Sequence, residues 1–103
     1  MADTILVTGS MDIDPAKRDD FLAAINELMA ATRVEDGCEA YSFSADVSDE
    51  GRFYISEQWA NQAVVDTHNA TPHLAKFMGS IGDFGLKGAT LTMWHGAEPT
   101  KLF

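Results

Sequence analysis

The chain has 103 residues, of which 46% are hydrophobic and 22% charged, a composition typical of one ordinary globular domain and not of a disordered or repetitive chain. Its formal net charge is -9, from 16 acidic and 7 basic residues, and the basic residues are scattered along the sequence. We therefore expect no nucleic acid partner, because phosphate binding needs a concentrated basic patch.

The first residues, MADTILVTGSMDID, contain neither a basic lead nor a long apolar run. From this we expect no signal peptide, no membrane partner and a cytoplasmic protein. The single cysteine, Cys38, excludes an internal disulfide bond and leaves too few thiols for a structural zinc site.

The first half of the chain predicts a strand, a helix and a hairpin. Apolar and polar residues alternate over residues 4–14, which predicts a strand. Asp14 and Pro15 then supply an N-cap and a first-turn proline for a helix over residues 15–34, and Gly37 suits the left-handed turn that ends it. Two alternating, aromatic-rich segments, CEAYSFSADV and RFYISEQWA, are separated by SDEG and predict an antiparallel hairpin.

The second half predicts two helices and a last strand. A short helix is expected over residues 61–70, and Thr71 with Pro72 restarts a second helix through HLAKFMGSI, whose apolar residues recur at helical spacing. The glycines of GDFGLKG end this helix. The alternating run ATLTMWHG, residues 89–96, then predicts the last strand.

The order strand, helix, strand, strand, helix, strand indicates an α+β fold of the split βαβ, ferredoxin-like kind. We expect one domain over residues 1–103, with a four-stranded antiparallel sheet, helices on one face and a polar tail from about residue 97. The helix-free face would carry Leu6, Tyr54 and Trp94 among polar residues. A homodimer packed sheet against sheet would cover these side chains.

A carboxylate and a histidine stand out where the third strand passes to the short helix. Glu57 shares one face of the strand with Ile55 and Trp59, and a carboxylate buried in such a row needs a partner. His68 lies four residues after Val64, so it is on the helix side that carries an apolar residue. We expect Glu57 and His68 to meet on the helix side of the sheet, directly or through one water.

Three segments, MDIDPAK, EDGCEAYSF and above all FYISEQWANQAVVDTHNATPHLAKF, make the chain resemble the antibiotic biosynthesis monooxygenase domain family over almost its whole length. The residues in step with the family in the last segment are Glu57, Trp59, Ala63, His68, Thr71, His73 and Phe77. The resemblance implies a dimeric α+β barrel with a pocket in each subunit between sheet and helices. It also implies kinship with cofactor-independent quinol and anthrone-type monooxygenases.

Such an enzyme needs a base, an apolar slot and exclusion of water, because the deprotonated phenol or quinol itself gives an electron to dioxygen. A histidine accepts a proton at neutral pH, and a neighbouring carboxylate fixes its tautomer. His68 and Glu57 are therefore the candidate catalytic residues. The same pair is equally consistent with an internal hydrogen bond that orders the connection between strand and helix.

Further residues are candidates for binding a flat aromatic or quinol-like substrate. They are Trp59, Tyr41, Phe43, Phe77, Met78, His73 and Gly9. Aromatic and methionine residues at these spacings are more often plain core, and His73 could equally be exposed or contact a neighbouring loop. Gly9 weakens its strand unless something approaches closely, so it is a candidate for opening the pocket.

We expect no cofactor. Three histidines without a carboxylate cluster at ligand spacing do not indicate a metal site. Relatives in the wider superfamily that degrade haem use an Asn on the first strand, where this chain has Gly9 or its neighbours, so haem is disfavoured. The sequence leaves two functions open: a cofactor-independent monooxygenase, or a non-catalytic small-molecule-binding or stress-associated dimer on the same scaffold.

Overall fold

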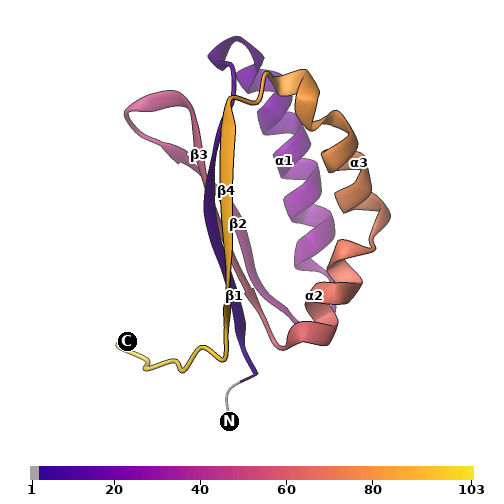
Figure 1. Cartoon of the computed structure of the whole chain (residues 1–103), viewed down its shortest axis with the longest axis vertical. Coiled ribbons are helices and arrows are strands. Elements are labelled where there is room, and N and C mark those ends of the chain that lie inside the picture. The colour runs from indigo at the N-terminus through magenta and orange to yellow at the C-terminus, as the bar shows by residue number, and fades with distance from the viewer. Residues whose placement is uncertain (1–2) are drawn as a thin grey trace.

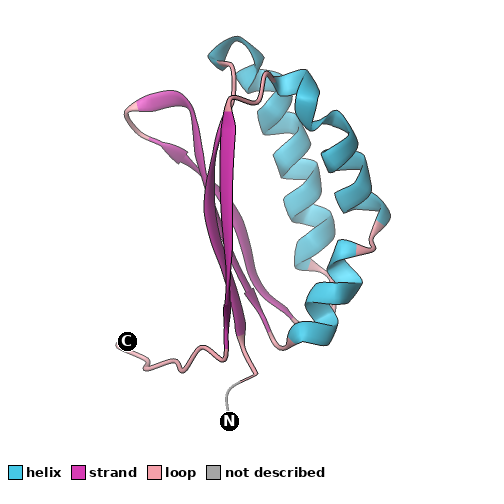
Figure 2. Cartoon of the chain, viewed as in Figure 1, coloured by secondary structure: helices cyan, strands magenta, loops and turns pink. Residues whose placement is uncertain are grey.

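The computed structural model of the chain describes residues 3–103. Its strands and α helices follow the predicted order, with two short 3-10 helices added. They are, in chain order, β1 (Ile5–Asp12), η1 (Pro15–Lys17), α1 (Arg18–Arg33), β2 (Cys38–Asp46), β3 (Asp49–Trp59), α2 (Gln62–Asn69), α3 (Pro72–Ser80), η2 (Ile81–Phe84) and β4 (Gly88–His95). Figure 1 shows the α helices together on one side of the sheet, and Figure 2 shows the other side bare.

The four strands form one antiparallel sheet in the order β2-β3-β1-β4. The first strand therefore lies in the middle, between the third and the last, as the split βαβ arrangement requires. The predicted ferredoxin-like α+β fold is confirmed. Packing of two sheets into a barrel remains a prediction.

Side-chain caps explain where the helices begin. Asp14 Oδ1 accepts a hydrogen bond from the Ala16 amide at 2.9 Å, as predicted, although the first turn is a 3-10 turn. Asn61 Oδ1 accepts from the Val64 amide at 3.1 Å and starts α2. Gly37 has φ of 80°, and an added Cβ would lie 2.6 Å from Val64 Cγ1, so a glycine is needed to turn the chain against α2.

Two element boundaries differ from the prediction. The hairpin turn was expected over residues 48–51, but β3 already starts at Asp49 and only Val47 and Ser48 separate the strands. Asp46 Oδ1 accepts from the Ser48 amide at 2.8 Å and closes this tighter turn. The residues of the tail, 97–103, form no helix or strand, and the tail ends in the exposed apolar side chains of Leu102 and Phe103.

The core lies between the sheet and the helices. The inward side chains of β1 and β3 are buried, and the largest fully buried ones are Trp59, Phe21 and Phe53. Phe21 of α1 packs on Phe53 with ring centroids 4.8 Å apart. This aromatic packing joins α1 to the middle of the sheet.

Strand β4 is the exception, because every one of its residues is exposed. Leu91 is 61% exposed and Met93 is 37% exposed, although both lie on the same face as the buried Val7 of β1. None of the α helices contacts β4 extensively in the way that α1 contacts β2. One strand of the sheet is therefore left without a helical cover.

The helix-free face carries Leu6, Tyr54 and Trp94, as the alternation predicted. Tyr54 is 42% exposed and Trp94 is 55% exposed. The Trp94 Nε1–H donates to Thr8 Oγ1 at 3.0 Å, so this indole already has a polar partner within the chain. Among the described residues, no helix is long and apolar enough to cross a membrane.

Candidate active site

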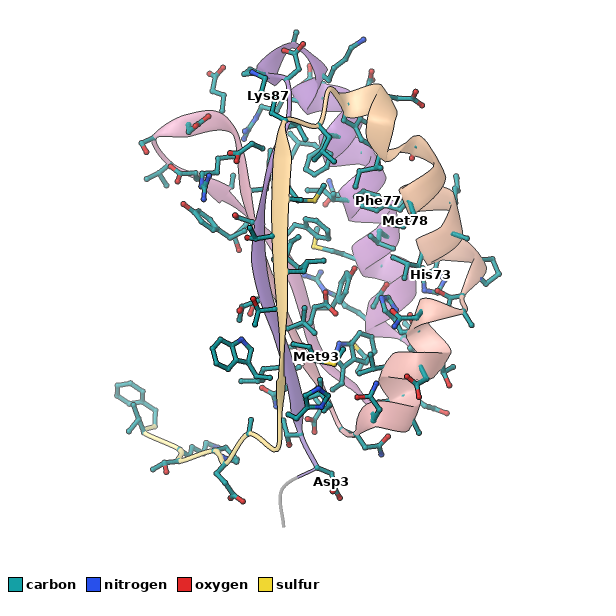
Figure 3. All side chains as sticks on the ribbon, in the orientation of Figure 1. Asp3, His73, Phe77, Met78, Lys87 and Met93 are labelled. Atoms are coloured by element: carbon teal, nitrogen blue, oxygen red, sulfur yellow. The ribbon has the colours of Figure 1, made fainter. Side chains whose placement is uncertain are left out.

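A cavity of about 650 Å³ lies between the sheet and the helices α2 and α3. All four strands contribute to its walls. It is lined by Val7, Met11, Tyr41, Phe43, Ile55, Glu57, Val65, His68, Asn69, Leu74, Phe77, Met78, Ile81, Leu86, Ala89, Leu91 and Met93. Met78 of α3 and Leu91 of β4 are 55% and 61% exposed, so the cavity opens along the uncovered strand. Figure 3 labels Phe77 and Met78 on the helical wall and Met93 on the opposite wall.

His68 reaches this cavity from the last turn of α2 and is only 4% exposed. Its ring packs against Trp59 at 4.7 Å and Tyr41 at 5.4 Å between centroids. Its Nδ1 lies 2.9 Å from Glu35 Oε2. Within residues 3–103 no side chain or backbone group hydrogen bonds to its other nitrogen, Nε2, so Nε2 is the atom available to a molecule in the cavity.

Glu35 belongs to the loop between α1 and β2 and joins two histidines. The same Oε2 that meets His68 lies 2.7 Å from His73 Nε2. The side chains of His68, Glu35 and His73 are 5%, 12% and 24% exposed, in that order. The second oxygen, Glu35 Oε1, is buried and has no hydrogen-bond partner in the described part of the chain. The hydrogen bonds to the two imidazoles therefore offset the energetic cost of burying this carboxylate.

Glu57 also lines the cavity, but its partner is Trp59. The Trp59 Nε1–H donates to Glu57 Oε1 at 2.9 Å, from two residues further along the same face of β3. Burial raises the pKa of the Glu57 carboxyl; the bond from Trp59 and the nearby His68 oppose this rise, and the Glu35 charge adds to it.

Glu57 and His68 share no direct hydrogen bond, so the direct form of the predicted pairing is wrong, whereas a contact through one water stays a prediction. Both side chains lie on the helix side of the sheet and line one cavity, as expected. However, Glu57 is held by its neighbour in the strand and His68 by a residue 33 positions earlier. The physical reason is that Trp59 lies two residues from Glu57 on the same face of β3. Its indole therefore reaches the carboxylate through the strand geometry alone.

The predicted substrate-binding residues divide into two groups. Those that line the cavity are Tyr41, Phe43, Phe77 and Met78. Trp59 does not, because it is 0% exposed and lies beneath the His68 ring. His73 does not either, since it contacts the loop at Glu35, which was one of the alternatives considered for it.

Gly9 also lies outside the cavity lining, and its role is different from the expected one. An added Cβ would lie 2.0 Å from the Thr90 carbonyl oxygen and 2.8 Å from a Leu91 methyl group. The glycine therefore allows the backbone of β4 to pair closely with β1. It holds the uncovered strand in place and does not itself open the pocket.

Sequence reasoning missed Glu35, the partner of both histidines. Its only signal was its position in EDGC, two residues before Gly37, where the chain turns back from α1 toward the sheet. The buried His68 and the half-buried His73 both need a hydrogen-bond partner, but Glu35 lies 33 residues before His68, so the sequence does not show which carboxylate supplies it. Leu91 and Met93 of β4 were also not anticipated as cavity walls.

Two other titratable groups near His68 are poor bases at neutral pH. Burial, followed by the charges of Glu57 and Glu35, raises the pKa of the Tyr41 hydroxyl well above its usual value. Burial, followed by the Glu35 charge, likewise raises the pKa of the Cys38 thiol. Both groups therefore stay protonated near neutral pH, so neither can serve as a base there.

The fold brings three metal-type donors together, which the sequence did not suggest. Single donor atoms of Glu35, His68 and His73 lie within 4.8 Å of one another. Two imidazoles and a carboxylate are ligands that Zn²⁺ accepts. However, the contacts at 2.9 and 2.7 Å have the length of hydrogen bonds that already satisfy both nitrogens. The absence of a metal remains a prediction for elemental analysis.

Comparison with known proteins agrees with this architecture. Residues 4–80 match the sequence profile of the antibiotic biosynthesis monooxygenase family, and the chain belongs to that family. An uncharacterized Synechocystis protein, sll1783, is 32% identical over 100 residues, covering 97% of this chain and 68% of that protein. YcnE of Bacillus subtilis, which carries a provisional monooxygenase name, is 30% identical over 74 residues, or 72% of this chain and 78% of its own.

Solved structures share the fold at lower sequence identity. A structure from Deinococcus radiodurans, assigned by its name to the same family, superposes with a TM-score of 0.87 at 24% identity, covering 96% of this chain and 98% of that one. Rv0793 of Mycobacterium tuberculosis gives 0.84 at 19% identity, with 95% and 99% covered. At these identities the likeness establishes the fold alone.

Proposed function

We propose that the chain is a cofactor-independent monooxygenase that oxidises a quinol or a similar phenolic substrate with dioxygen. The observation that carries this is His68: its ring is buried in the wall of a largely apolar cavity, and one nitrogen is fixed by Glu35. If Nδ1 donates to the carboxylate, Nε2 carries a lone pair and can accept a proton from a bound hydroxyl.

The chemistry requires no bound redox group because the substrate is its own reductant. His68 removes a phenolic proton, the resulting anion gives one electron to dioxygen, and the two radicals combine to form a carbon–oxygen bond. The O–O bond then breaks, one oxygen atom leaves as water, and the ring becomes a quinone. Hydroquinone and dioxygen thus give hydroxybenzoquinone and water. The ring gains one oxygen atom of dioxygen. The second oxygen atom leaves as water together with the two hydrogen atoms that the ring loses. Every electron taken up by dioxygen comes from the ring.

Glu57 is proposed as the second polar contact. The Glu57 carboxylate lines the cavity and can accept a hydrogen bond from a second substrate hydroxyl. Glu57 and His68 are borne by opposite walls of the cavity, one on β3 and the other on α2. A flat molecule with two oxygens on opposite edges of its ring system suits that placement, and the apolar remainder of the lining suits its rings.

The test is dioxygen uptake with hydroquinone and 1,4-dihydroxynaphthalene as probes. We expect His68→Gln to lower kcat by about 10² or more, the usual contribution of general base catalysis. His95→Gln is the matched control, because His95 lies at the end of β4 outside the cavity lining and should leave the rate unchanged. Equal rates in the two variants would refute the role of His68.

The alternative function, a non-catalytic binding protein, is supported by the same hydrogen bonds, since Glu35 and His73 would order the α2 region without any chemistry. It predicts that 2-naphthol binds the cavity while no quinol stimulates dioxygen uptake. Fluorescence titration together with an oxygen electrode separates the two functions.

We also propose that the chain forms a homodimer through the helix-free face. The exposed Tyr54 and Trp94 side chains, with Leu6 between the polar residues, support this proposal. Light scattering should give twice the mass of 11.2 kDa at micromolar concentration, and Trp94→Glu should shift the equilibrium toward the monomer. A wild-type monomer under these conditions would contradict it.

A further inference from the structure

The cavity has one polar end. The lining residues whose side chains carry nitrogen or oxygen atoms are Tyr41, Glu57, His68 and Asn69. Tyr41 and Glu57 pair directly across β2 and β3, and the His68 ring packs on Tyr41 at 5.4 Å between centroids. Asn69 follows His68 at the end of α2. These polar groups therefore gather at the end of the cavity that lies beneath α2.

The strand register shows how far the rest of the cavity extends from this polar end. Val7 of β1 pairs with Glu57 of β3 on one side and with Met93 of β4 on the other. Met11, four residues further along β1, pairs with Ala89 of β4. Met11 and Ala89 also line the cavity, and four strand residues span about 13 Å. The lining thus continues along the strands for about this distance.

The far end of the cavity is apolar. Leu86 lies there, because the amide of the next residue, Lys87, donates to the last carbonyl of β1 at 2.8 Å. Figure 3 shows Lys87 and Met93 near opposite ends of β4, with Met78 of α3 at a height between them. Among the described residues that line this stretch, none carries a side-chain nitrogen or oxygen atom. We call the stretch the tail slot; its walls include Met11, Met78, Leu86, Ala89 and Leu91.

The tail slot leaves apolar side chains in water that a ligand could cover. Leu91 is 61% exposed and Leu86 is 39% exposed, although both line the cavity. Removing such surface from water is favourable in proportion to its area. Hydrogen-bond partners, in contrast, are available only at the polar end. The two ends of the cavity therefore suit two chemically different parts of one elongated molecule.

We propose that the substrate is a phenol or quinol that carries an unbranched apolar tail. Its ring lies at the polar end between Glu57 and His68, and its tail extends along β4 toward Leu86. This substrate class rests on the proposed function, whereas the tail slot itself concerns binding alone. A length of about 13 Å accommodates one ring and an extended chain of about six carbon atoms.

The first measurement is binding and requires no turnover. A series of 4-alkylphenols, from ethyl through butyl, hexyl and octyl to decyl, displaces 2-naphthol from the cavity, and fluorescence reports the affinity. Each methylene group that enters the tail slot should tighten binding by up to about fourfold. We expect the gain to continue to hexyl and to stop by decyl, whose tail passes Leu86 into solvent. Equal affinities for the ethyl and hexyl compounds would overturn the proposal.

The decisive variant is Ala89→Phe, which places a ring in the tail slot. Ala89 is exposed at the start of an uncovered strand, so the larger side chain should not disturb the core. We expect wild-type affinity for 4-ethylphenol and a loss of about tenfold or more for 4-hexylphenol. Ala30→Phe is the matched control, because Ala30 is exposed on α1 outside the cavity lining and should leave the whole series unchanged.

A second variant, Leu91→Asn, guards against a ring at position 89 that turns into solvent. It puts a polar side chain in the wall of the tail slot and should reduce the gain for each methylene group. If both variants keep the full wild-type gain, the tail does not lie along β4. A gain seen only in the dimer-face variant Trp94→Glu would mean that a second copy fills the slot, and this too would overturn the proposal.

The second measurement is dioxygen uptake with 1,4-dihydroxynaphthalene and its 2-hexyl derivative. Wild-type protein should show a lower KM for the hexyl compound, by about tenfold or more, and Ala89→Phe should remove this difference. A KM that is the same for both compounds in wild type would contradict the substrate class. If neither compound stimulates uptake, the proposed function fails, whereas the displacement series still decides whether the tail slot exists.

Discussion

Strands β3 and β4 carry similar alternating sequences but meet very different surroundings. In β3 the inward side chains Phe53, Ile55 and Trp59 are 1%, 5% and 0% exposed. In β4 the inward side chains Leu91 and Met93 are 61% and 37% exposed. Both strands pair with β1, so the difference comes from the helices. The cavity therefore exists because no helix covers β4. The alternating sequence of β4 does not by itself distinguish it from β3.

The largest effect is expected from the covered strand. Phe53→Ala removes a ring that packs on Phe21 at 4.8 Å and should lower the free energy of unfolding by about 3–5 kcal/mol. Urea denaturation followed by circular dichroism measures this loss. A loss below about 1 kcal/mol would mean that α1 does not pack on β3 as described.

The next effect concerns the hydrogen-bonded cluster behind the cavity. Glu35→Ala leaves the buried His68 Nδ1 and the His73 nitrogen without an acceptor and should lower the free energy of unfolding by about 1–3 kcal/mol. Glu39→Ala on β2 is the control, because its exposed contact with Gln58 should contribute no more than about 0.5 kcal/mol. Equal losses in the two variants would contradict the buried cluster.

A smaller effect, dependent on pH, is expected at Glu57. Since burial raises its pKa, its contribution to stability is complete below the unfolded value of about 4.3 and is lost as pH rises through the folded pKa. Glu57→Gln keeps an acceptor for Trp59 Nε1–H and removes this loss. The variant should therefore gain stability over wild type at pH 7 and show less gain at pH 4, as measured by urea denaturation at both pH values. A gain of the same size at both would contradict the raised pKa.

The smallest effect is expected on the uncovered strand. Leu91→Ala trims a side chain that is mostly in solvent and should change the free energy of unfolding by no more than about 0.5 kcal/mol. A loss comparable with that of Phe53→Ala would show that something covers β4 in solution. Sedimentation of the two variants would then show whether a second copy of the chain is that cover.

The sequence by itself determined the secondary structure and its order. The alternation around Ile5 and Val7, the helix starts at Asp14 and Thr71 and the turn at Gly37 depend on residues close in sequence, so they could be predicted. The same alternation placed Leu6, Tyr54 and Trp94 on the helix-free face. Tyr41 and Phe43 of β2 and Phe77 and Met78 of α3 could be expected at the cavity because large apolar side chains on the facing sides of a sheet and a helix meet between them.

Only the tertiary structure decided the partners within the site. Glu57 was expected to meet His68, but the choice between Trp59, two residues away, and His68, on the next helix, depends on side-chain positions that no periodicity encodes. Glu35 reaches His68 because the loop after α1 and the end of α2 pack together. Hydrogen bonds between distant segments are fixed by that packing, whereas strands and helices are fixed by neighbouring residues, and this is why the fold was predictable and the site only partly so.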